Sequence, residues 1–245
     1  MCWKLSLQKF VTLNQVISIL SGCVLLLFFL GCGNAEKYAS IYKAGRIWNY
    51  DVSITDSSGN VVDTFSLIMT TRASTSTEKI IRSITVCYEY KIGDSLVQKE
   101  CTGVVDNERS ISLHPPREYV LEFTEVLPFP GANKGMKSNT FISYSSESDL
   151  HIQKATYFDK GKNETVNLAG KMIKQHLWVE DTTTIKYQNE ALFCYVLKGE
   201  NLNYIEELGE FKCTYFYNEK YGFVKWIYHP PWGDEVVISL RSTNF

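Results

Sequence analysis

The stretch Trp48-Asn49-Tyr50-Asp51-Val52-Ser53-Ile54 alternates apolar with polar side chains, which is typical of a β-strand with one buried face. Asp56-Ser57-Ser58-Gly59-Asn60, a run of turn-forming residues, follows it. The next run, Val61 to Met69, again alternates apolar and polar positions. Two alternating runs joined by a short turn predict a β-hairpin, so we expect a fold built from antiparallel strands.

The same alternation recurs along the chain, and no helical apolar spacing persists beyond the N-terminal segment. Besides the first hairpin, we expect strands at 80–92, 96–105, 119–127, 151–158, 172–179, 183–187, 192–197, 211–217, 223–228 and 236–240, with a single helical turn at 201–208. So many strands must share one core and hide their edges. The sequence therefore predicts an all-β fold, an antiparallel barrel or half-barrel, with a β-sandwich as the alternative.

The composition excludes several classes of protein. Of the 245 residues, 44% are hydrophobic and 21% are charged, which excludes a disordered or collagen-like chain. The formal net charge of −2 offers no polybasic surface, so we expect no nucleic-acid partner. Aromatic residues reach 13%, and this enrichment favours strands over helices.

The N-terminus has the pattern of an export signal. Lys4 and Lys9 form a short positive start, and the segment Phe10 to Ala35 then contains no charged residue. Within it, an apolar run ends in a small residue followed by a cysteine. That arrangement is typical of a bacterial lipoprotein signal, whose cysteine is acylated and becomes the first mature residue.

Two cysteines fit this role. We expect lipidation at Cys32, because the apolar run ends there and a polar tether follows. Cys23 is the alternative: Leu20-Ser21-Gly22-Cys23 fits the usual lipoprotein signal better, but cleavage there would leave seven apolar residues on the mature chain. An uncleaved membrane anchor over Val11 to Gly31 is a third interpretation, because about 20 apolar residues span a bilayer.

These signals divide the chain into a lipoprotein signal peptide at 1–31, a short tether at 32–45 and a single antiparallel β domain at 46–245. The folded domain is then expected outside the cytoplasm, anchored in the cell envelope at the outer membrane. Removal of Lys4 and Lys9 with the signal changes the net charge from −2 to −4. Attachment to the membrane is therefore expected to depend on the acyl chains rather than on a basic patch.

Three segments carry a resemblance to known proteins. Ser112-Leu113-His114-Pro115-Pro116-Arg117, Leu127-Pro128-Phe129-Pro130 and the segment Tyr217 to Lys225 are similar to segments of uncharacterised lipoproteins of Bacteroidota-type bacteria. The resemblance implies kinship and envelope location, and it transfers no activity and no functional residue. The strand plan also resembles the half-barrels of periplasmic lipoprotein-carrier and lipid-binding proteins, in architecture alone.

No motif of a metal site or an active site is present in the sequence. The four histidines, at 114, 151, 176 and 229, have no metal-ligand spacing, and no nucleophile elbow or phosphate loop occurs. Glu122 with Glu125, or Glu206 with Glu207, could be imagined as paired glycosidase carboxylates, but acidic residues at strand ends are usually solvated. We therefore expect no catalytic residue, no metal and no cofactor, and a protein that is not an enzyme.

The tripeptide His-Pro-Pro occurs twice, as His114-Pro115-Pro116 and as His229-Pro230-Pro231. Two prolines fix the backbone and remove two hydrogen-bond donors, so each motif is expected to be a rigid corner at a strand end. A functional alternative is a paired rim, with the adjacent Arg117 and Trp232 facing the mouth of a ligand site.

Four cysteines remain after the signal, and an exported chain meets an oxidising compartment. If Gly93-Asp94-Ser95 is a three-residue loop, Cys87 lies directly opposite Cys101, which predicts a disulfide. The second predicted disulfide joins Cys194 to Cys213, on strands that flank the connection from Leu197 to Gly209. The alternatives are four free thiols, or a two-residue turn at Gly93-Asp94 that would offset the first pair by one residue.

A barrel of this size must fill its interior, and the aromatic side chains are expected to supply most of that core. If part of the interior stays open, aromatic walls suit an acyl chain or another apolar ligand. We therefore expect a membrane-anchored, non-enzymatic envelope lipoprotein that binds a lipid or other apolar ligand. The alternative is an envelope module with a filled core that binds another protein or a glycan.

Overall fold

The predicted first hairpin is formed by β1 (Ile47–Thr55) and β2 (Val61–Ala73), which pair antiparallel with Val52 opposite Phe65. It belongs to a computed structural model that describes residues 40–73, 84–136, 141–142, 156–159, 164–167, 175–201 and 209–245. The chain divides into two units, 1–39 and 40–245, and the described residues all belong to the second. No helix among those residues is long and apolar enough to cross a membrane.

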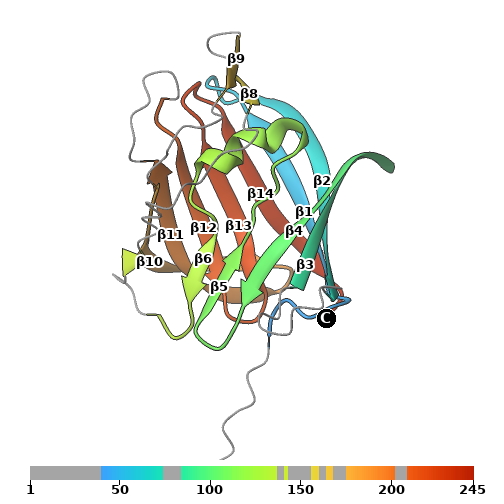
Figure 1. Ribbon diagram of the computed structural model, residues 1–245, viewed down its shortest axis with the longest axis vertical. Helices are drawn as coiled ribbons and strands as arrows, with labels where there is room; N and C mark the ends of the chain where they lie inside the picture. The colour runs from blue at the N-terminus through green and yellow to red at the C-terminus, as the bar shows by residue number, and fades with distance from the viewer. Residues whose placement is uncertain are drawn as a thin grey trace, which may run out of the picture. The chain divides into compact units, whose positions relative to one another are not determined.

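Twelve strands form one antiparallel sheet in the order β6-β5-β4-β3-β2-β1-β14-β13-β12-β11-β10-β7, which curls into a half-barrel (Figure 1). The remaining strands of this sheet are β3 (Ile84–Ile92), β4 (Ser95–Asp106), β5 (Ser110–Leu113), β6 (Gly131–Asn133), β7 (Phe141–Ile142), β10 (Gln175–Tyr187), β11 (Glu190–Asn201), β12 (Lys212–Asn218), β13 (Gly222–His229) and β14 (Glu235–Thr243). β8 (Thr156–Asp159) and β9 (Glu164–Asn167) pair separately. The all-β half-barrel is confirmed, and the sandwich alternative is wrong because all the described strands except β8 and β9 belong to one curled sheet.

The first and last strands of the sheet are neighbours. β1 pairs with β14 antiparallel, with Val52 opposite Ile238 and Ile54 opposite Val236. Every other neighbouring pair among β1 to β6 and among β10 to β14 consists of consecutive strands. The β1–β14 ladder therefore joins an N-terminal and a C-terminal set of strands.

One face of the sheet forms the core. In β1, Trp48, Tyr50, Val52 and Ile54 are buried and alternate with more exposed residues, as the sequence pattern predicted. The largest fully buried side chains are Trp48, Trp226, Tyr42, Tyr50, Tyr88, Tyr90, Tyr215, Tyr217, Tyr228, Phe211, Phe223 and Leu67. Aromatic rings therefore fill the concave side, as expected.

The segment predicted as a strand at 119–127 is instead a 3₁₀ helix, η1 (Tyr119–Val126). The bond from Leu127 N–H to Thr124 O, at 3.2 Å, closes its last three-residue turn. Prolines 116 and 128 bracket the segment, and a residue without an N–H group cannot continue a sheet ladder. The apolar residues Leu121, Phe123 and Val126 are buried, so η1 packs on the sheet instead of joining it.

Other strands differ from prediction in extent. The strands expected at 172–179 and 183–187 are one strand, β10, in which the register shifts between Val179 and Asp181. The strand expected at 151–158 is described only as β8 (Thr156–Asp159), and the helical turn expected at 201–208 lies outside the described residues, apart from Asn201 at the end of β11.

The folded unit begins earlier than predicted. Ile41 and Tyr42, which the sequence analysis assigned to the tether, have exposed fractions of 6% and 0%. Apolar side chains this deeply buried belong to the core. The folded unit therefore begins at Ser40 rather than at residue 46.

Candidate functional site

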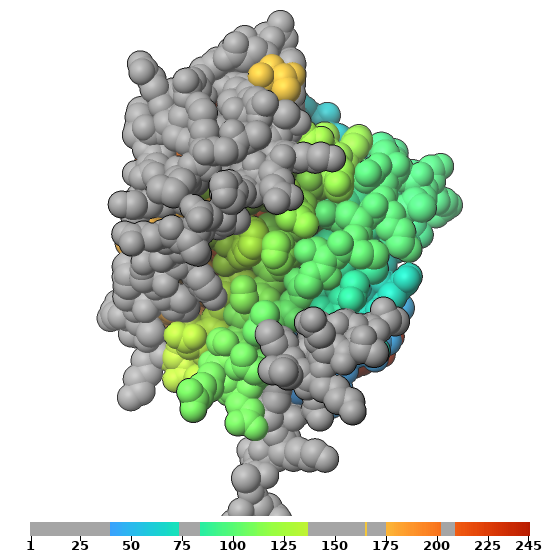
Figure 2. Space-filling view, in the orientation of Figure 1, coloured from blue at the N-terminus to red at the C-terminus, as the bar shows by residue number. Residues whose placement is uncertain are grey.

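The concave side of the sheet beneath η1 is the best candidate for a binding site. Phe123 of η1 packs edge to face against Tyr228 of β13, with ring centres 5.8 Å apart, and stacks against Phe211, with ring centres 6.0 Å apart. In Figure 1, η1 crosses in front of the sheet, and in Figure 2 light green atoms of this part of the chain reach the surface. η1 therefore covers a packed group of aromatic side chains on β13 and its neighbours, which we call the aromatic cluster.

Two buried polar atoms of the aromatic cluster stand out in their hydrogen bonding. Trp226 Nε1 and Tyr228 Oη are fully buried, and within the described part of the chain neither makes a hydrogen bond of good geometry. The hydroxyl of Tyr215 lies close enough to that of Tyr228 to interact with it. The two residues are two positions apart on β13, so their side chains leave the same face of the strand. A buried donor without an acceptor costs about 1–3 kcal/mol, so two adjacent ones mark a place where an acceptor is missing.

Neighbouring rings of the core do have hydrogen-bond acceptors. Trp48 Nε1 donates to Tyr221 O at 2.9 Å, and Tyr50 Oη donates to Phe223 O at 3.0 Å. Tyr215 Oη, whose ring lies 6.0 Å from that of Tyr228, donates to Pro128 O at 2.7 Å. The unpaired state of Trp226 and Tyr228 is therefore a local feature rather than a general property of this core.

Electrostatics keep Tyr228 in its donor form. Burial raises the pKa of the Tyr228 hydroxyl well above its ordinary value of 10.0. The phenol therefore retains its proton, and the indole N–H of Trp226 can only donate. A molecule bound at these two atoms must present a hydrogen-bond acceptor.

Arg117 lies at the start of η1 and binds two carboxylates. Its guanidinium is 3.6 Å from Glu100 on β4 and 3.6 Å from Glu125 in η1. Its backbone N–H donates to Glu100 Oε1 at 2.7 Å, and Tyr90 Oη donates to the same oxygen. Burial raises the pKa of both carboxyl groups, more strongly than Arg117 lowers it. The cluster therefore fixes one end of η1 to the sheet.

Trp232 lies against the middle of η1. Its ring packs edge to face on Phe123, at 5.6 Å, and on Phe211, at 5.7 Å, and its Nε1 donates to Asp234 at 3.0 Å. The structure thus brings both predicted rim residues, Arg117 and Trp232, to the same helix. Both residues hold η1 over the aromatic cluster. Each of them directly follows one of the two His-Pro-Pro segments.

His114 is held in the neutral form. Its ring lies 4.1 Å from that of Phe129, and burial, helped by Arg117, lowers its pKa from 6.5 to about 4. Its backbone carbonyl accepts a hydrogen bond from Tyr88 Oη at 2.7 Å. Within the described residues, no group of three or more His, Cys, Asp or Glu side chains could hold a metal ion. Glu206 and Glu207 lie outside those residues.

Cys87 and Cys101 form a disulfide, with their Cα atoms 4.0 Å apart. The loop prediction behind it was wrong: Ile92 pairs with Ser95, so Gly93-Asp94 is a two-residue turn. The register then shifts by one between Lys91 and Tyr90, which leaves Val97 as an extra residue in β4. This bulge compensates for the shorter turn and returns Cys87 to the position opposite Cys101.

The second predicted disulfide is absent: Cys194 and Cys213 are both buried free thiols. Cys213 on β12 faces Gly199 on β11, and Cys194 is five residues before Gly199. At about 3.4 Å per residue, that offset is roughly 17 Å, far beyond the reach of a disulfide. The prediction failed because the residues between the two strands do not reveal their register.

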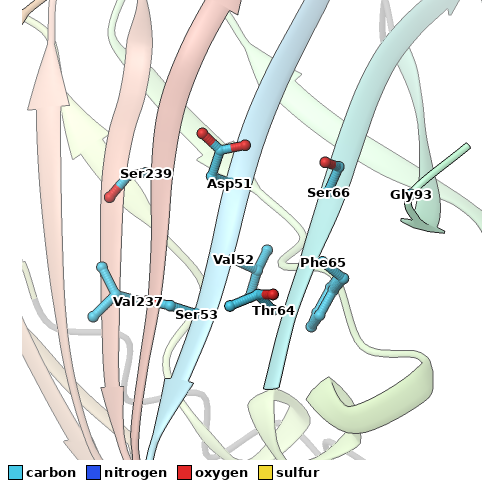
Figure 3. A pocket seen from close by; sticks show the side chains of 9 residues that line it. All are labelled: Asp51, Val52, Ser53, Thr64, Phe65, Ser66, Gly93, Val237 and Ser239. Atoms are coloured by element: carbon cyan, nitrogen blue, oxygen red, sulfur yellow. The ribbon is translucent and has the colours of Figure 1, made fainter. Parts of the chain in front are cut away.

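The outer face of the sheet carries a polar groove of about 380 Å³ across β14, β1 and β2 (Figure 3). Its side-chain hydroxyls belong to Ser53, Thr64, Ser66 and Ser239, and none of them hydrogen-bonds to the described residues. Asp51 lies at one end and pairs with Arg241 at 3.0 Å. The groove is shallow and lined by strand residues, so it is a secondary candidate.

Sequence reasoning assigned Trp226 to the core and did not single out Tyr228. Alternation along 223–228 does indicate which side chains point inward, but no sequence pattern shows whether a buried donor finds an acceptor. That depends on the carbonyls that other strands and η1 place nearby.

No protein-family model and no curated protein sequence matches this chain. Among solved structures, it is similar to a protein of Parabacteroides distasonis described as a lipoprotein, with 11% identity, a TM-score of 0.43, and coverage of 83% of this chain and 96% of that one. A second is a protein of Bacteroides fragilis described as exported, with a YmcC-like fold, at 10% identity and a TM-score of 0.43, covering 83% of this chain and 97% of that one. A third, a DUF1329 family protein of Desulfovibrio piger, has 9% identity and a TM-score of 0.30, with coverage of 84% and 87%.

The first two of these proteins come from Bacteroidota. At these identities and TM-scores, the likeness concerns the path of the chain. We take no binding residue and no activity from it.

Proposed function

We propose that this protein is a non-enzymatic, membrane-anchored envelope lipoprotein that holds a small apolar ligand between β13 and η1. The observation that carries the proposal is the buried indole N–H of Trp226, which has no acceptor within the described residues and lies two positions from the buried hydroxyl of Tyr228. The ligand is expected to be mostly apolar, because the walls are aromatic, and to carry one acceptor such as an ester or carboxyl oxygen.

The covering helix gives such a ligand a way in. η1 is held at one end by Arg117 and along its length by the ring of Trp232. Both contacts join side chains rather than strands, so η1 can leave the sheet without breaking a ladder of backbone hydrogen bonds. Entry of the ligand beneath η1 would then place its apolar part against Phe123 and Phe211.

The test is binding of a fluorescent fatty acid, cis-parinaric acid, to the purified full chain. We expect saturable binding that weakens about fivefold in Trp226→Phe and in Tyr228→Phe, because each loses one hydrogen bond of about 1 kcal/mol. Tyr50→Phe is the matched control, since its hydroxyl already donates to Phe223 O, and its affinity for the probe should equal that of the wild type.

Stability without probe gives a second readout. In Tyr228→Phe, which keeps the ring, removal of the hydroxyl should leave the free energy of unfolding unchanged or raise it, whereas Tyr50→Phe should lower it by about 1 kcal/mol. Trp226→Phe is left out of this comparison, because the smaller ring leaves a cavity in the core. Equal affinity of all variants for the probe would place any lipid site elsewhere. Absence of saturable binding would overturn the ligand proposal.

A second candidate function is an interaction module with a filled core. The hydroxyl-lined groove of Figure 3 favours it, because four hydroxyls without protein partners can bind a polar chain such as a glycan. This candidate predicts no saturable uptake of an apolar probe, so the same titration separates the two functions.

The anchor is tested separately. Because the apolar run ends at Cys32, Cys32→Ser should release the protein from the membrane fraction or leave it unprocessed. Fractionation followed by mass spectrometry of the N-terminal peptide measures both results. Cys23→Ser is the matched control, and release by that variant, with no effect of Cys32→Ser, would move the anchor to Cys23.

A further inference from the structure

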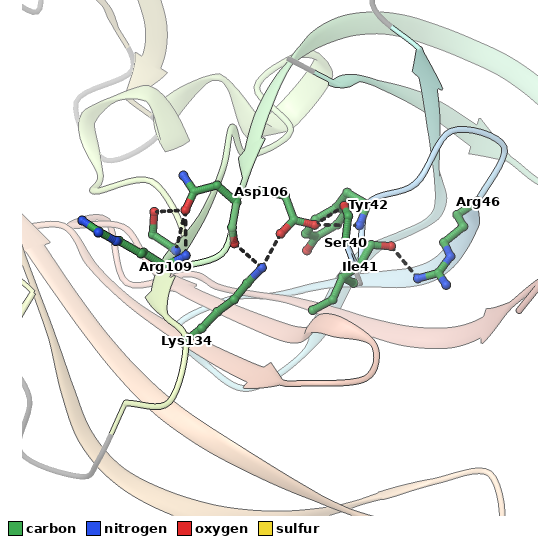
Figure 4. A network of polar contacts seen from close by, with 9 residues as sticks. Ser40, Ile41, Tyr42, Arg46, Asp106, Arg109 and Lys134 are labelled. Carbon is green, nitrogen blue, oxygen red and sulfur yellow. Dashed lines mark hydrogen bonds and ion pairs between the residues drawn. The ribbon is translucent and has the colours of Figure 1, made fainter. Parts of the chain in front are cut away.

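The chain enters the folded unit through a short strap, Ser40–Tyr42, that is bound to the end of β4. Ser40 Oγ donates to Asp106 Oδ2 at 2.5 Å, and Tyr42 N–H donates to the same oxygen at 3.0 Å. Lys134, just after β6, binds the other oxygen of Asp106 at 2.7 Å (Figure 4). One buried carboxylate thus fixes the strap to the N-terminal half of the sheet.

The strap also reaches the C-terminal half of the sheet. Tyr42 is fully buried, and its hydroxyl accepts a hydrogen bond from Phe223 N–H at 3.4 Å. Gly222, with φ +78°, leaves room for this hydroxyl, since a Cβ there would lie 2.5 Å from it. Arg46 donates to Ile41 O at 2.6 Å and lies over the ring of Phe245. The strap therefore fixes where the tether leaves the domain.

Basic side chains surround this strap. Lys43 follows it directly, and the Thr71 hydroxyl, next to Arg72, donates to Lys43 O. Lys134 N–H donates to Arg109 O at 2.9 Å, which ties Arg109 to the Asp106 contact. Lys43, Arg72 and Arg109 are exposed, and none of them forms an ion pair within the described chain.

Further charges at the strap end largely cancel one another. Among the described residues, the acidic groups there are Asp106, which pairs with Lys134, Glu190, which is 3.8 Å from Lys220, and the two turn residues Glu108 and Glu219. Arg46 and Lys186 add to the basic side. An excess of basic groups therefore remains at this end.

The opposite end of the strands is acidic. The turns after β1, β3 and β13, together with η1, carry Asp56, Asp94, Glu118, Glu122, Glu125, Asp234 and Glu235. Arg117 lies among them and is already paired with Glu100 and Glu125. Among the described residues, basic groups therefore prevail at the strap end and acidic groups at the opposite end of the strands.

We propose that the strap end is a membrane-facing surface whose partner is an anionic lipid bilayer. The proposal rests on the proposed N-terminal anchor, which brings this end close to the membrane. Basic groups near an anionic leaflet are attracted and acidic ones repelled, within a distance of about 10 Å at 0.1 M salt. The acyl chains attach the domain, and the charge separation orients it, with η1 and the candidate site facing the aqueous side.

The test reads the orientation of the lipidated full chain in vesicles. A fluorophore is attached at Ala44→Cys, beside the strap, or at Ser58→Cys, in the turn after β1, and the vesicles carry nitroxide lipids as quenchers. Both positions are exposed, and the two free native cysteines of the described chain are buried. In vesicles containing phosphatidylglycerol we expect at least threefold stronger quenching at position 44, falling towards equality at 1 M salt.

A charge variant and its control complete the test. Lys43→Gln/Arg72→Gln/Arg109→Gln should reduce quenching at position 44 at least twofold, whereas Lys91→Gln/Lys99→Gln/Lys212→Gln, with the same change in net charge away from the strap, should not. Flotation with the vesicles is measured on every sample. If the lipidated chain without charge substitutions does not float with the vesicles, the anchor and this proposal are both overturned. If it floats but quenching is equal at both positions, this proposal alone is overturned.

Discussion

Replacing Cys87 and Cys101 together by alanine is expected to lower the free energy of unfolding by about 3 kcal/mol. The disulfide joins residues separated by 14 positions, so it restricts a loop of the unfolded chain whose closure would otherwise cost that much entropy. The hairpin of β3 and β4 keeps its ladder of hydrogen bonds in the variant, so the native fold should persist. Urea denaturation, followed by far-ultraviolet circular dichroism, measures the difference.

A reducing agent supplies the control for this variant. Reduction of the wild-type protein should lower its stability to that of Cys87→Ala/Cys101→Ala, whereas the same treatment should leave the variant unchanged. Wild-type stability that is insensitive to reduction would show that the bridge is not formed or does not restrict the unfolded chain.

Asp106→Ala is expected to lower the free energy of unfolding by about 3–4 kcal/mol. The side chain of Asp106 is fully buried and that of Lys134 is 19% exposed, so the substitution breaks an ion pair that is largely shielded from water. Ser40 Oγ and Tyr42 N–H lose their acceptor as well. Limited trypsin digestion should then cut after Lys43, because the strap is no longer held, and urea denaturation measures the loss of stability.

The double variant Asp106→Ala/Lys134→Met is the matched control. Burial lowers the pKa of Lys134 to about 8 and raises that of Asp106, so desolvation outweighs the attraction between the two groups. Removing both charges should therefore restore about half of the lost stability. A single variant as stable as the wild type, or a double variant less stable than Asp106→Ala, would contradict the role given to this pair.

Local sequence patterns predicted the hairpins well. In β1 and β2, and in β12 and β13, alternation and turn residues lie next to each other in the chain, so the information is local. The bridge between Cys87 and Cys101 shows the limit of such counting. The facing pair was predicted correctly from a wrong loop, because the bulge at Val97 compensates for a turn that is one residue shorter.

Features that depend on contacts between distant segments were not predictable from the sequence. The apolar residues of 119–127 are compatible with a strand. The flanking prolines argue against backbone pairing in a sheet only when the positions of the neighbouring strands are known. The same holds for Cys194 and Cys213, whose strands pair in a register that the intervening residues do not reveal. Whether the buried donors of Trp226 and Tyr228 find an acceptor depends on where other segments place their carbonyl groups. No sequence pattern indicates those positions.

The pairing of β1 with β14 has a consequence for how the chain can be made and moved. Until β14 has been synthesised, β1 lacks one of its two neighbours, and the two halves of the sheet cannot join. Contacts between the extremes of a chain also form slowly, because a long loop must close first. A polypeptide with this topology cannot complete its sheet until β14 has been made, so it can still pass unfolded through a membrane pore up to that point, as the export that we propose requires.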